Sequence, residues 1–246
     1  MAANYTGTSH ELRGCINDAE NLTEFLIESG FVQNEHITLV KEPKAADIFE
    51  NLQNLAEETR EKHITHVFIS YSGHGTYMKD TNGDEEDGRD EALVPVDYAK
   101  SGMVRDDELC EIVASIDPNT RVTVLFDCCH SGTALDLPYR FVGRQETAPC
   151  SKGSRCHPKT VMISGCMDAQ TSADAYDQER KEFSGAMTSA MLDVLRCEPT
   201  LACDAFALVA AMRVLLKERR MSQIPQLCTS QCASDCAVPE ILPTKQ

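Results

Sequence analysis

The chain has 246 residues, of which 42% are hydrophobic and 25% are charged, as in a folded globular protein and unlike a disordered one. Its 39 acidic residues outnumber the 23 lysines and arginines and give a formal net charge of -16. Such a field repels phosphate backbones and anionic lipid and attracts cations and basic peptides. The composition therefore argues against nucleic-acid and membrane-surface binding.

Cysteine usage and hydropathy bound the class of protein further. The 12 cysteines include no C-x-x-C pair and are too few for a disulfide scaffold. No signal peptide opens the sequence, and the longest apolar run, residues 205–216, contains Arg213 and is too short to span a membrane. We therefore expect a cytoplasmic protein with reduced thiols.

Apolar runs alternate with amphipathic segments, which predicts a parallel sheet with helices on both faces. In chain order, the predicted elements are a helix at 15–29, a strand at 36–40, a helix through 48–55, strands at 65–71 and 92–96, a helix through 109–116, strands at 121–127 and 160–164, helices at 183–196 and 204–219, and a strand at 223–229. Residues 131–158 show no periodicity and predict a long exposed loop. One α/β domain accounts for this pattern.

Two of the predicted strands end in reactive side chains. The motif SGHG (72–75) follows one strand, and DCCHSG (127–132) contains the end of another. Sites in open α/β sheets form beyond the carboxyl ends of strands, so a His and a Cys that are distant in sequence can meet there. Taken singly, the His is more often a loop residue and the Cys more often a packed thiol. Together they predict a Cys–His nucleophilic site, with the Gly75 amide as an oxyanion donor.

Five stretches carry a more specific similarity. They are FISYSGHGT (68–76), DGRDEALVPVDY (87–98), LFDCCHSGTALDLP (125–138), ISGCMDAQTSADA (163–175) and FSGAMTSAML (183–192). The sequence resembles type I metacaspases, which are caspase-like cysteine peptidases linked to programmed cell death. The resemblance implies one caspase-like α/β domain over residues 1–246, with a large-subunit-like part at 1–139, an exposed loop at 140–158 and a small-subunit-like part at 159–246.

The resemblance assigns the catalytic roles that spacing leaves open. It implies that Cys129 is the nucleophile and His74 its base, with Cys128 as a buried neighbour. Members of the family cleave peptides after Arg or Lys and act as monomers. Self-cleavage is also implied, at a basic residue of the segment that follows Pro138. The candidate sites are Arg140, Arg144, Lys152, Arg155 and Lys159.

Substrate specificity is carried by two carboxylates. The resemblance places Asp18 and Asp127 in the pocket that receives the basic side chain, with Ser72 and Cys15 lining it. Two converging carboxylates repel each other unless a cation lies between them, and a guanidinium can bond to both. From the residues alone, Asp18 is equally well explained as an acid in the first turn of a helix.

The acidic residues around position 90 allow two alternative interpretations as a metal site. Positions 1, 3, 5 and 12 of an EF-hand loop are matched by Asp80, Asn82, Asp84 and Glu91. Glu85 stands where that loop needs glycine, and the flanking segments are predicted as strands, so an EF-hand is disfavoured. The resemblance implies a different Ca²⁺ site, formed by Asp90, Asp106, Asp107 and Asp136. The bland alternative is a solvated acidic loop and, for Asp106 and Asp107, a helix start.

One feature departs from the family pattern. Metacaspases have an apolar core strand before the stretch that resembles NYTGT (4–8), and here only MAA (1–3) precedes it. A missing strand exposes apolar surface and unpaired backbone on its neighbours. The leading hypothesis is a calcium-dependent endopeptidase acting on basic peptides. The alternatives are an inactive or truncated caspase-like regulatory module and a calcium-binding module without catalysis.

Overall fold

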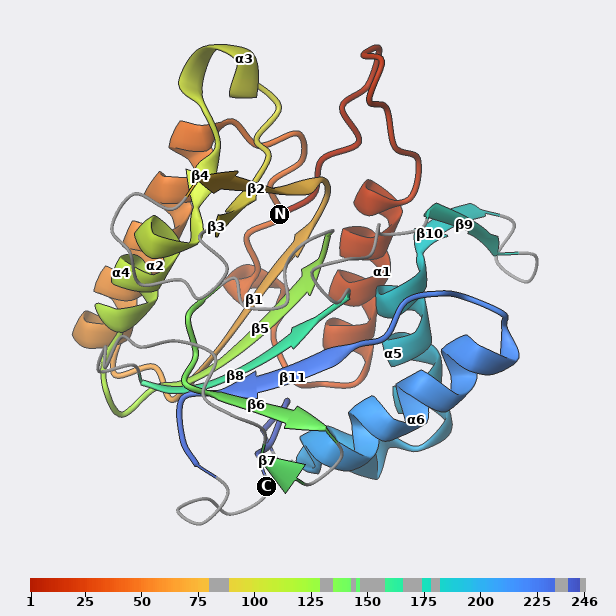
Figure 1. The fold of residues 1–246 in the computed structure, drawn as a ribbon. Helices are drawn as coiled ribbons and strands as arrows, with labels where there is room; N and C mark the ends of the chain where they lie inside the picture. The colour runs from red at the N-terminus through yellow and green to blue at the C-terminus, as the bar shows by residue number, and fades with distance from the viewer. Residues whose placement is uncertain are drawn as a thin grey trace.

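A central sheet organises the fold of the computed structural model (Figure 1). The structure describes residues 1–79, 89–128, 135–142, 145–146, 158–165, 174–177, 182–232 and 239–243. Within these residues, the helices are α1 (Cys15–Glu28), α2 (Ala45–Lys62), α3 (Tyr98–Ser101), α4 (Asp106–Ala114), α5 (Ala186–Cys197) and α6 (Ala205–Glu218), with 3-10 turns η1 (Asn34–His36) and η2 (Pro199–Cys203).

The main sheet has the order β1-β5-β8-β11-β6-β7. Its strands are β1 (His66–Ser72), β5 (Arg121–Asp127), β8 (Lys159–Ser164), β11 (Gln226–Thr229), β6 (Tyr139–Val142) and β7 (Gln145–Glu146). The first three are mutually parallel, and β11 is antiparallel to both β8 and β6. Two small sheets pair β2 (Gly75–Lys79), β3 (Arg89–Leu93) and β4 (Val104–Arg105), and β9 (Asp174–Asp177) with β10 (Glu182–Gly185).

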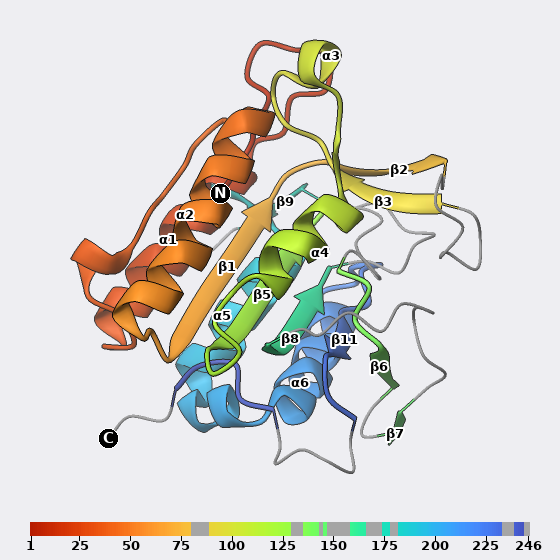
Figure 2. The same ribbon diagram turned by 90° about the vertical axis from the view of Figure 1, so that its left-hand side faces the viewer.

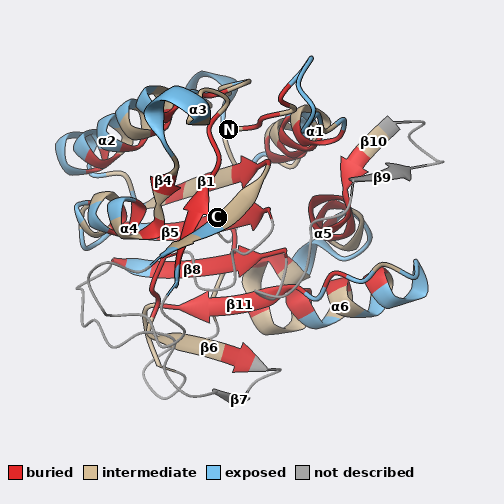
Figure 3. Ribbon diagram, turned by 45° about the horizontal axis from the view of Figure 1, so that its top comes forward, coloured by how far each residue is buried: buried red, intermediate tan, exposed pale blue. Residues whose placement is uncertain are grey.

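Alternation along β5 divides the core between the two faces of the sheet. Val124 and Phe126 pack on one face against α2 and α4, whereas Leu125 packs on the other against α1, α5 and α6. Figures 1 and 2 show these two helical layers on opposite sides of the sheet, and Figure 3 shows buried residues on the strands and on the inward sides of the helices. The predicted α/β architecture with helices on both faces is confirmed, with antiparallel strands added at one edge.

The predicted strand at 36–40 is wrong. Residues 34–36 form η1, and residues 37–40 are extended but belong to no strand. The only bridge of this segment joins Lys41 to Ala2. The backbone of this stretch has no paired strand beside most of its length, and a segment without such a partner does not form a strand.

The predicted loop over 131–158 is also wrong in part. Residues 139–142 form β6, which pairs with β11, and residues 145–146 form β7. Phe141 is 1% exposed and packs in the core beside α6. The apolar positions of this short strand alternate over too few residues to be recognised as a period. Residues 129–134, 143–144 and 147–157 lie outside the described part of the chain.

The first three residues pair with the edge of the main sheet. Ala2 forms parallel bridges to both Ser72 and Lys41, and the Met1 amino group donates to the Ser70 carbonyl at 2.9 Å. Residues 1–3 thus take the sheet position beside the carboxyl end of β1. The remainder of that edge of β1 pairs with no strand among the described residues.

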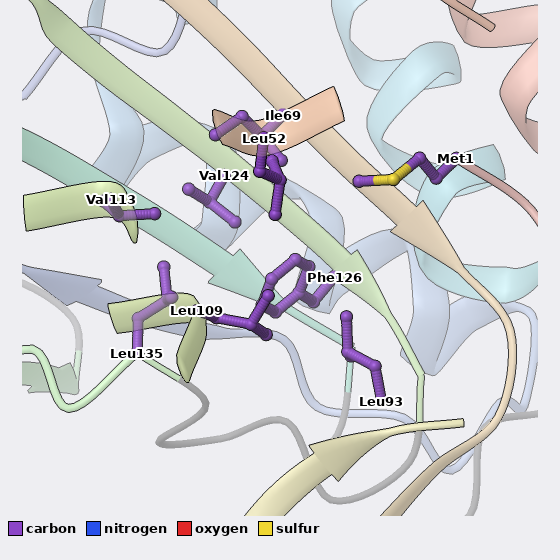
Figure 4. Close-up of a pocket in the computed structure, with 9 residues that line it drawn as sticks. All are labelled: Met1, Leu52, Ile69, Leu93, Leu109, Val113, Val124, Phe126 and Leu135. Atoms are coloured by element: carbon purple, nitrogen blue, oxygen red, sulfur yellow. The ribbon is translucent and has the colours of Figure 1, made fainter. Parts of the chain in front are cut away.

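An apolar cavity lies between the sheet and α4 (Figure 4). It is lined by Met1, Leu52, Ile69, Leu93, Leu109, Val113, Val124, Phe126 and Leu135. Ligand sites combine apolar walls with a few polar groups, and these nine side chains offer none, so the cavity is a gap in core packing. Among the described helices, none is both long and apolar enough to cross a bilayer.

Candidate active site

The register of β1 and β5 brings the two reactive strand ends together. Ser72 and Asp127 are paired neighbours, and the Gly73 amide donates to the Asp127 carbonyl at 3.3 Å. Figure 1 shows both arrowheads at the same edge of the sheet. His74 follows Ser72 by the same number of residues as Cys129 follows Asp127. The topology therefore places His74 and the chain that leaves β5 at Cys128 on adjacent connections at one edge, as expected for an open α/β sheet.

His74 is held at both its backbone and its ring. Its amide donates to the Tyr5 hydroxyl at 2.9 Å, and its imidazole Nε2 lies 2.7 Å from the His10 carbonyl oxygen. A carbonyl oxygen can only accept, so Nε2 carries the proton of the neutral ring and Nδ1 is left as the base. Sequence reasoning found no orienting residue, because a backbone carbonyl has no residue-type signature.

The structure distinguishes the adjacent cysteines. Cys128 is 1% exposed and packs with the core cluster that faces α2 and α4. A thiol enclosed in apolar surroundings is inert toward an external carbonyl. Cys129, the predicted nucleophile, lies outside the described residues. The burial of Cys128 excludes it and is consistent with its predicted role as a packed neighbour.

Gly75 lies where an oxyanion donor is expected. It opposes Leu93 in the antiparallel β2–β3 pair, and the adjacent rung runs from the Val94 amide to the His74 carbonyl at 3.1 Å. Gly75 and Leu93 are therefore a non-hydrogen-bonded pair. Because β2 is the edge strand of its sheet, the Gly75 amide points away from β3 and outward beside His74.

Asp18 and Asp127 converge on one backbone position. They are 2% and 3% exposed. The Gly185 amide donates to both Asp18 oxygens, at 2.8 and 2.9 Å. A Cβ atom built on Gly185 would contact Asp127 Oδ2 and would lie 2.6 Å from Asp18 Oδ2. Asp18 therefore reaches across to the β10–α5 junction, which a purely helix-capping acid would not do.

Three further residues shape this carboxylate pair. Thr188 donates to Asp127 Oδ2 through its amide at 2.9 Å and its hydroxyl at 2.8 Å, and Gln223 Nε2 lies 3.4 Å from Oδ1. Gly185 supplies the space between the carboxylates. Sequence reasoning missed all three, because they come from segments far from the Cys–His motifs and their residue types are common in packed interiors.

The other predicted pocket residues lie nearby. Ser72 is buried beside Asp127 through the β1–β5 register. Cys15 is 7% exposed and packs against Ala2 and Ala19. Asn17 Nδ2 donates to the Phe183 carbonyl at 2.9 Å, which ties α1 to the segment that leads into Gly185.

Carboxylates gather at the start of α4. Asp106 and Asp136 are 2% and 6% exposed, and Asp106 accepts from the Glu91 amide at 3.1 Å and the Asp107 amide at 2.9 Å. Burial, followed by the charges of Asp136 and Glu91, raises the pKa of Asp106 to about 9. Concentrated buried negative charge with oxygen donors suits a hard cation such as Ca²⁺. Glu91, which sequence reasoning assigned only to the disfavoured EF-hand, belongs to this cluster.

The other two predicted calcium ligands lie differently. Asp90 is 1% exposed and forms an ion pair with Arg105 at 2.5 Å, and Asp107 is half-buried on the first turn of α4. Within the described ranges, no three acidic, His or Cys side chains are gathered closely enough to hold a metal ion. Asp80, Asn82 and Asp84 lie outside the described residues, and the segments that flank them form β2 and β3, the strands that the sequence predicts there.

Comparison with known proteins identifies the family. Residues 1–138 match the model of the metacaspase, peptidase C14 domain, and this range contains every catalytic, pocket and calcium-site residue predicted from the sequence. The chain belongs to the metacaspase family. Metacaspase-3 of Trypanosoma brucei brucei is 33% identical over 254 residues, which cover 94% of this chain and 70% of that protein. Metacaspase-1 of Yarrowia lipolytica is 32% identical, and the match covers 60% of its length.

Solved structures agree on the fold. Protein GSU0716 from Geobacter sulfurreducens superposes with a TM-score of 0.63 at 24% identity, covering 93% of this chain and 90% of that one. Caspase-1 from Spodoptera frugiperda superposes with a TM-score of 0.50 at 15% identity, covering 89% and 78%. The metacaspase chain therefore has a caspase-like fold, as its sequence resemblance predicts.

Proposed function

We propose that this metacaspase chain is a cysteine endopeptidase that cleaves after Arg or Lys, with Cys129 as the nucleophile and His74 as its base. The observation that carries this proposal is the convergence of Asp18 and Asp127 at Gly185. This carboxylate pair lies at the same sheet edge from which His74 extends, and Asp127 immediately precedes the cysteine pair. A receptor for one basic side chain and a general base thus share one site.

The proposed chemistry is acyl transfer. His74 Nδ1 takes the thiol proton of Cys129, and the thiolate attacks the carbonyl carbon of the peptide bond. The negative charge that develops on the carbonyl oxygen is stabilised by the outward-facing Gly75 amide. The imidazolium then protonates the departing amine as the C–N bond breaks. Water, deprotonated by His74, hydrolyses the thioester and releases the acid product.

Specificity follows from charge and fixed geometry. The Gly185 amide and Thr188 hold the two carboxylates in place before substrate arrives. Arg or Lys at the cleaved position would neutralise both acids, and Arg can do so through paired charge-assisted hydrogen bonds. An acidic residue at that position would add a third negative charge in a buried site.

Calcium dependence belongs to the same proposal. Asp106 and Asp136 would hold Ca²⁺, which would offset their mutual repulsion. Asp90 would contribute once Arg105 releases it, and Asp107 would contribute from its half-buried position on the first turn of α4. Asp136 follows the nucleophile segment closely in sequence, so neutralising it affects the segment that carries Cys129. Glu91, whose side chain hydrogen-bonds with Asp106, is the additional carboxylate in reach.

For self-cleavage in cis, we propose fewer cleavage sites than the five basic residues that the sequence offers. Arg140 lies in β6, paired with Cys228, and Lys159 lies in β8, paired with Arg121. A protease needs an extended segment free of sheet pairing. The candidates that remain are Arg144, Lys152 and Arg155, which lie outside the described residues.

A peptidase assay tests the proposal. Fluorogenic peptides ending in Arg, Lys or Asp at the cleaved position are compared with excess calcium and with excess chelator. We expect calcium-dependent turnover of the Arg and Lys peptides only. Cys129→Ala should abolish it, and Cys128→Ala, which removes a core thiol, should retain it. Asp127→Asn should reduce kcat/KM for the basic peptides by about 100-fold, because one of two buried partners of the cation is lost.

Other outcomes separate the alternatives. Turnover that survives in Cys129→Ala would contradict the assigned nucleophile. Full activity in chelator would remove calcium from the proposal and leave the peptidase. Tight calcium binding without Cys129-dependent turnover would favour the calcium-binding module.

A further inference from the structure

Tyr5 occupies an unusual place beside the candidate base. It is 3% exposed, and its ring lies over the His74 imidazole with centroids 4.7 Å apart. Its backbone has φ +53°, in the left-handed region. An aromatic residue there is strained, and such strain persists only where the surroundings hold it.

The backbone of Tyr5 is held by contacts on both sides. Its amide donates to Glu42 Oε2 at 3.0 Å, and its carbonyl accepts from the Thr8 amide at 3.1 Å and hydroxyl at 2.8 Å. Glu42 itself has φ +50°. The same short loop carries the His10 carbonyl that accepts from the His74 ring. One loop therefore contacts His74 at both its amide and its imidazole.

A buried network connects the Tyr5 hydroxyl to the backbone of His74. Each hydroxyl has one proton to donate. The Tyr5 hydroxyl donates to the Val94 carbonyl at 2.6 Å and accepts the His74 amide at 2.9 Å. The Tyr71 hydroxyl lies 3.0 Å from Tyr5 Oη and 2.9 Å from the Val94 carbonyl. Val94 closes the network, because its amide donates to the His74 carbonyl at 3.1 Å.

Gly73 is required by this network. A Cβ atom at this position would lie 2.8 Å from Tyr71 Oη and 3.0 Å from Tyr5 Oη. Cβ atoms essentially never approach hydroxyl oxygens so closely, so any side chain would displace the tyrosine pair. The glycine before His74 in the SGHG motif thus has a local steric reason that is independent of substrate.

We propose that Tyr5 is a positioning residue for His74. Its hydroxyl fixes the backbone of His74, and its ring packs on the imidazole. The Tyr71 hydroxyl in turn supports the Tyr5 hydroxyl. The expected effect on turnover rests on the proposed function, whereas the placement of His74 by Tyr5 does not. Tyr5 contacts no substrate and takes no proton in the reaction. It acts by holding Nδ1 toward the adjacent connection that carries Cys129.

The Tyr5 and Tyr71 hydroxyl groups of this network stay protonated near neutral pH. Burial raises the pKa of Tyr5, and burial also raises that of Tyr71, so both hydroxyls stay neutral donors. The support of His74 is therefore independent of pH across the range in which a Cys–His pair titrates.

The test compares Tyr5→Phe, Tyr71→Phe and Tyr98→Phe. Tyr98 borders the same apolar cluster as Tyr5 and serves as the matched control. The first measurement is the ring ¹⁵N spectrum of His74, assigned by its loss in His74→Asn. We expect the wild type to show the Nε2–H tautomer and Tyr5→Phe to show a mixture of tautomers, with Tyr98→Phe unchanged. This readout requires no turnover.

The second measurement is steady-state kinetics on the basic peptide with calcium. We expect Tyr5→Phe to lower kcat by about 10- to 100-fold with KM within about twofold, because misplacing a base affects the chemical step. Tyr71→Phe leaves the His74 amide bonded to Tyr5, so its kcat should fall by about threefold. Tyr98→Phe should match the wild type.

The outcomes are distinguishable from failure of the proposed function. If the wild type is active and kcat of Tyr5→Phe equals kcat of Tyr98→Phe, the positioning role of Tyr5 is overturned. An inactive wild type would remove the proposed function, and the His74 spectrum would then decide the inference alone. A spectrum unchanged in Tyr5→Phe would overturn it, and a mixture of tautomers in Tyr5→Phe but not in Tyr98→Phe would support it.

Discussion

The protonation of the Asp106 carboxyl group links the free energy of unfolding to pH and to cation binding. It is buried beside Asp136 and Glu91, and its pKa of about 9 lies far above the ordinary 3.8. Between these two values the folded state binds a proton that the unfolded state lacks. The free energy of unfolding therefore falls as pH rises through this range. A bound cation would replace the proton and remove this dependence.

The pH dependence of stability in excess chelator tests this environment. We expect the melting temperature of the wild type to fall by several degrees between pH 5 and pH 8. Asp106→Asn should flatten this decline, because the amide does not titrate. Glu111→Gln, on the exposed side of the same helix, should keep the wild-type slope. Equal slopes in Asp106→Asn and the wild type would contradict the assignment.

Among the elements, the β10–α5 junction determines the form of the proposed substrate pocket. β10 ends at Gly185, α5 begins at Ala186, and the Gly185 amide meets a carboxylate from α1. The Arg13 guanidinium lies over the Phe183 ring at 5.3 Å, which adds a second contact between the start of α1 and β10. Helix α1 thus meets the consecutive elements β10 and α5, which are distant from it in sequence, where a side chain larger than glycine cannot fit.

Gly185→Ala therefore tests the role of the β10–α5 junction in placing both carboxylates, rather than the role of Asp18 or Asp127 alone. The added methyl group would displace Asp18 and Asp127 from their shared position, so we expect kcat/KM for Arg and Lys peptides to fall by at least about 100-fold. Ala190→Gly, one turn further along α5, costs about 1 kcal/mol of helix stability without contacting the carboxylates. Its kcat/KM should stay near the wild-type value. If both variants lose activity in proportion to their stability, the junction has no specific role.

For the whole molecule, the sheet joins two apolar layers into one cooperative unit. The cluster that faces α2 and α4 includes Leu109, and the cluster that faces α1, α5 and α6 includes Leu192. Both clusters share strands β1, β5 and β8, whose alternate residues contribute to opposite faces. Loss of either layer exposes the sheet that supports the other, so the two layers unfold together.

Leu109→Ala and Leu192→Ala test this cooperativity. Each removes a side chain no more than 2% exposed, which costs about 2–5 kcal/mol and lowers the melting temperature by about 5–15 °C. We expect one transition in both variants, coincident in near-UV and far-UV circular dichroism at fixed calcium. Val214→Ala, at a 57% exposed position of α6, should shift it by less than about 1 °C. Two separate transitions would show that the layers are independent.

Sequence patterns determined most of the architecture because the strongest signals are local. The strand over residues 121–127 coincides with β5, and the helix predicted at 15–29 differs from α1 by one residue. Long apolar runs and amphipathic periods fix such elements whatever their neighbours. The strand predicted at 36–40 failed because pairing depends on a neighbour. The strand over residues 139–142 was missed because it is too short to show a period.

The sequence by itself determined the fold class, the family and the reactive motifs, since these depend on residue types in fixed local order. Only the tertiary structure decided that Asp18 reaches Gly185, and that the Tyr5 hydroxyl and the His10 carbonyl hold His74. Each of these facts is a contact between segments distant along the chain, or involves a backbone atom that every residue possesses. Side-chain patterns carry no record of such contacts, because they arise only when the strands pair and the helices pack.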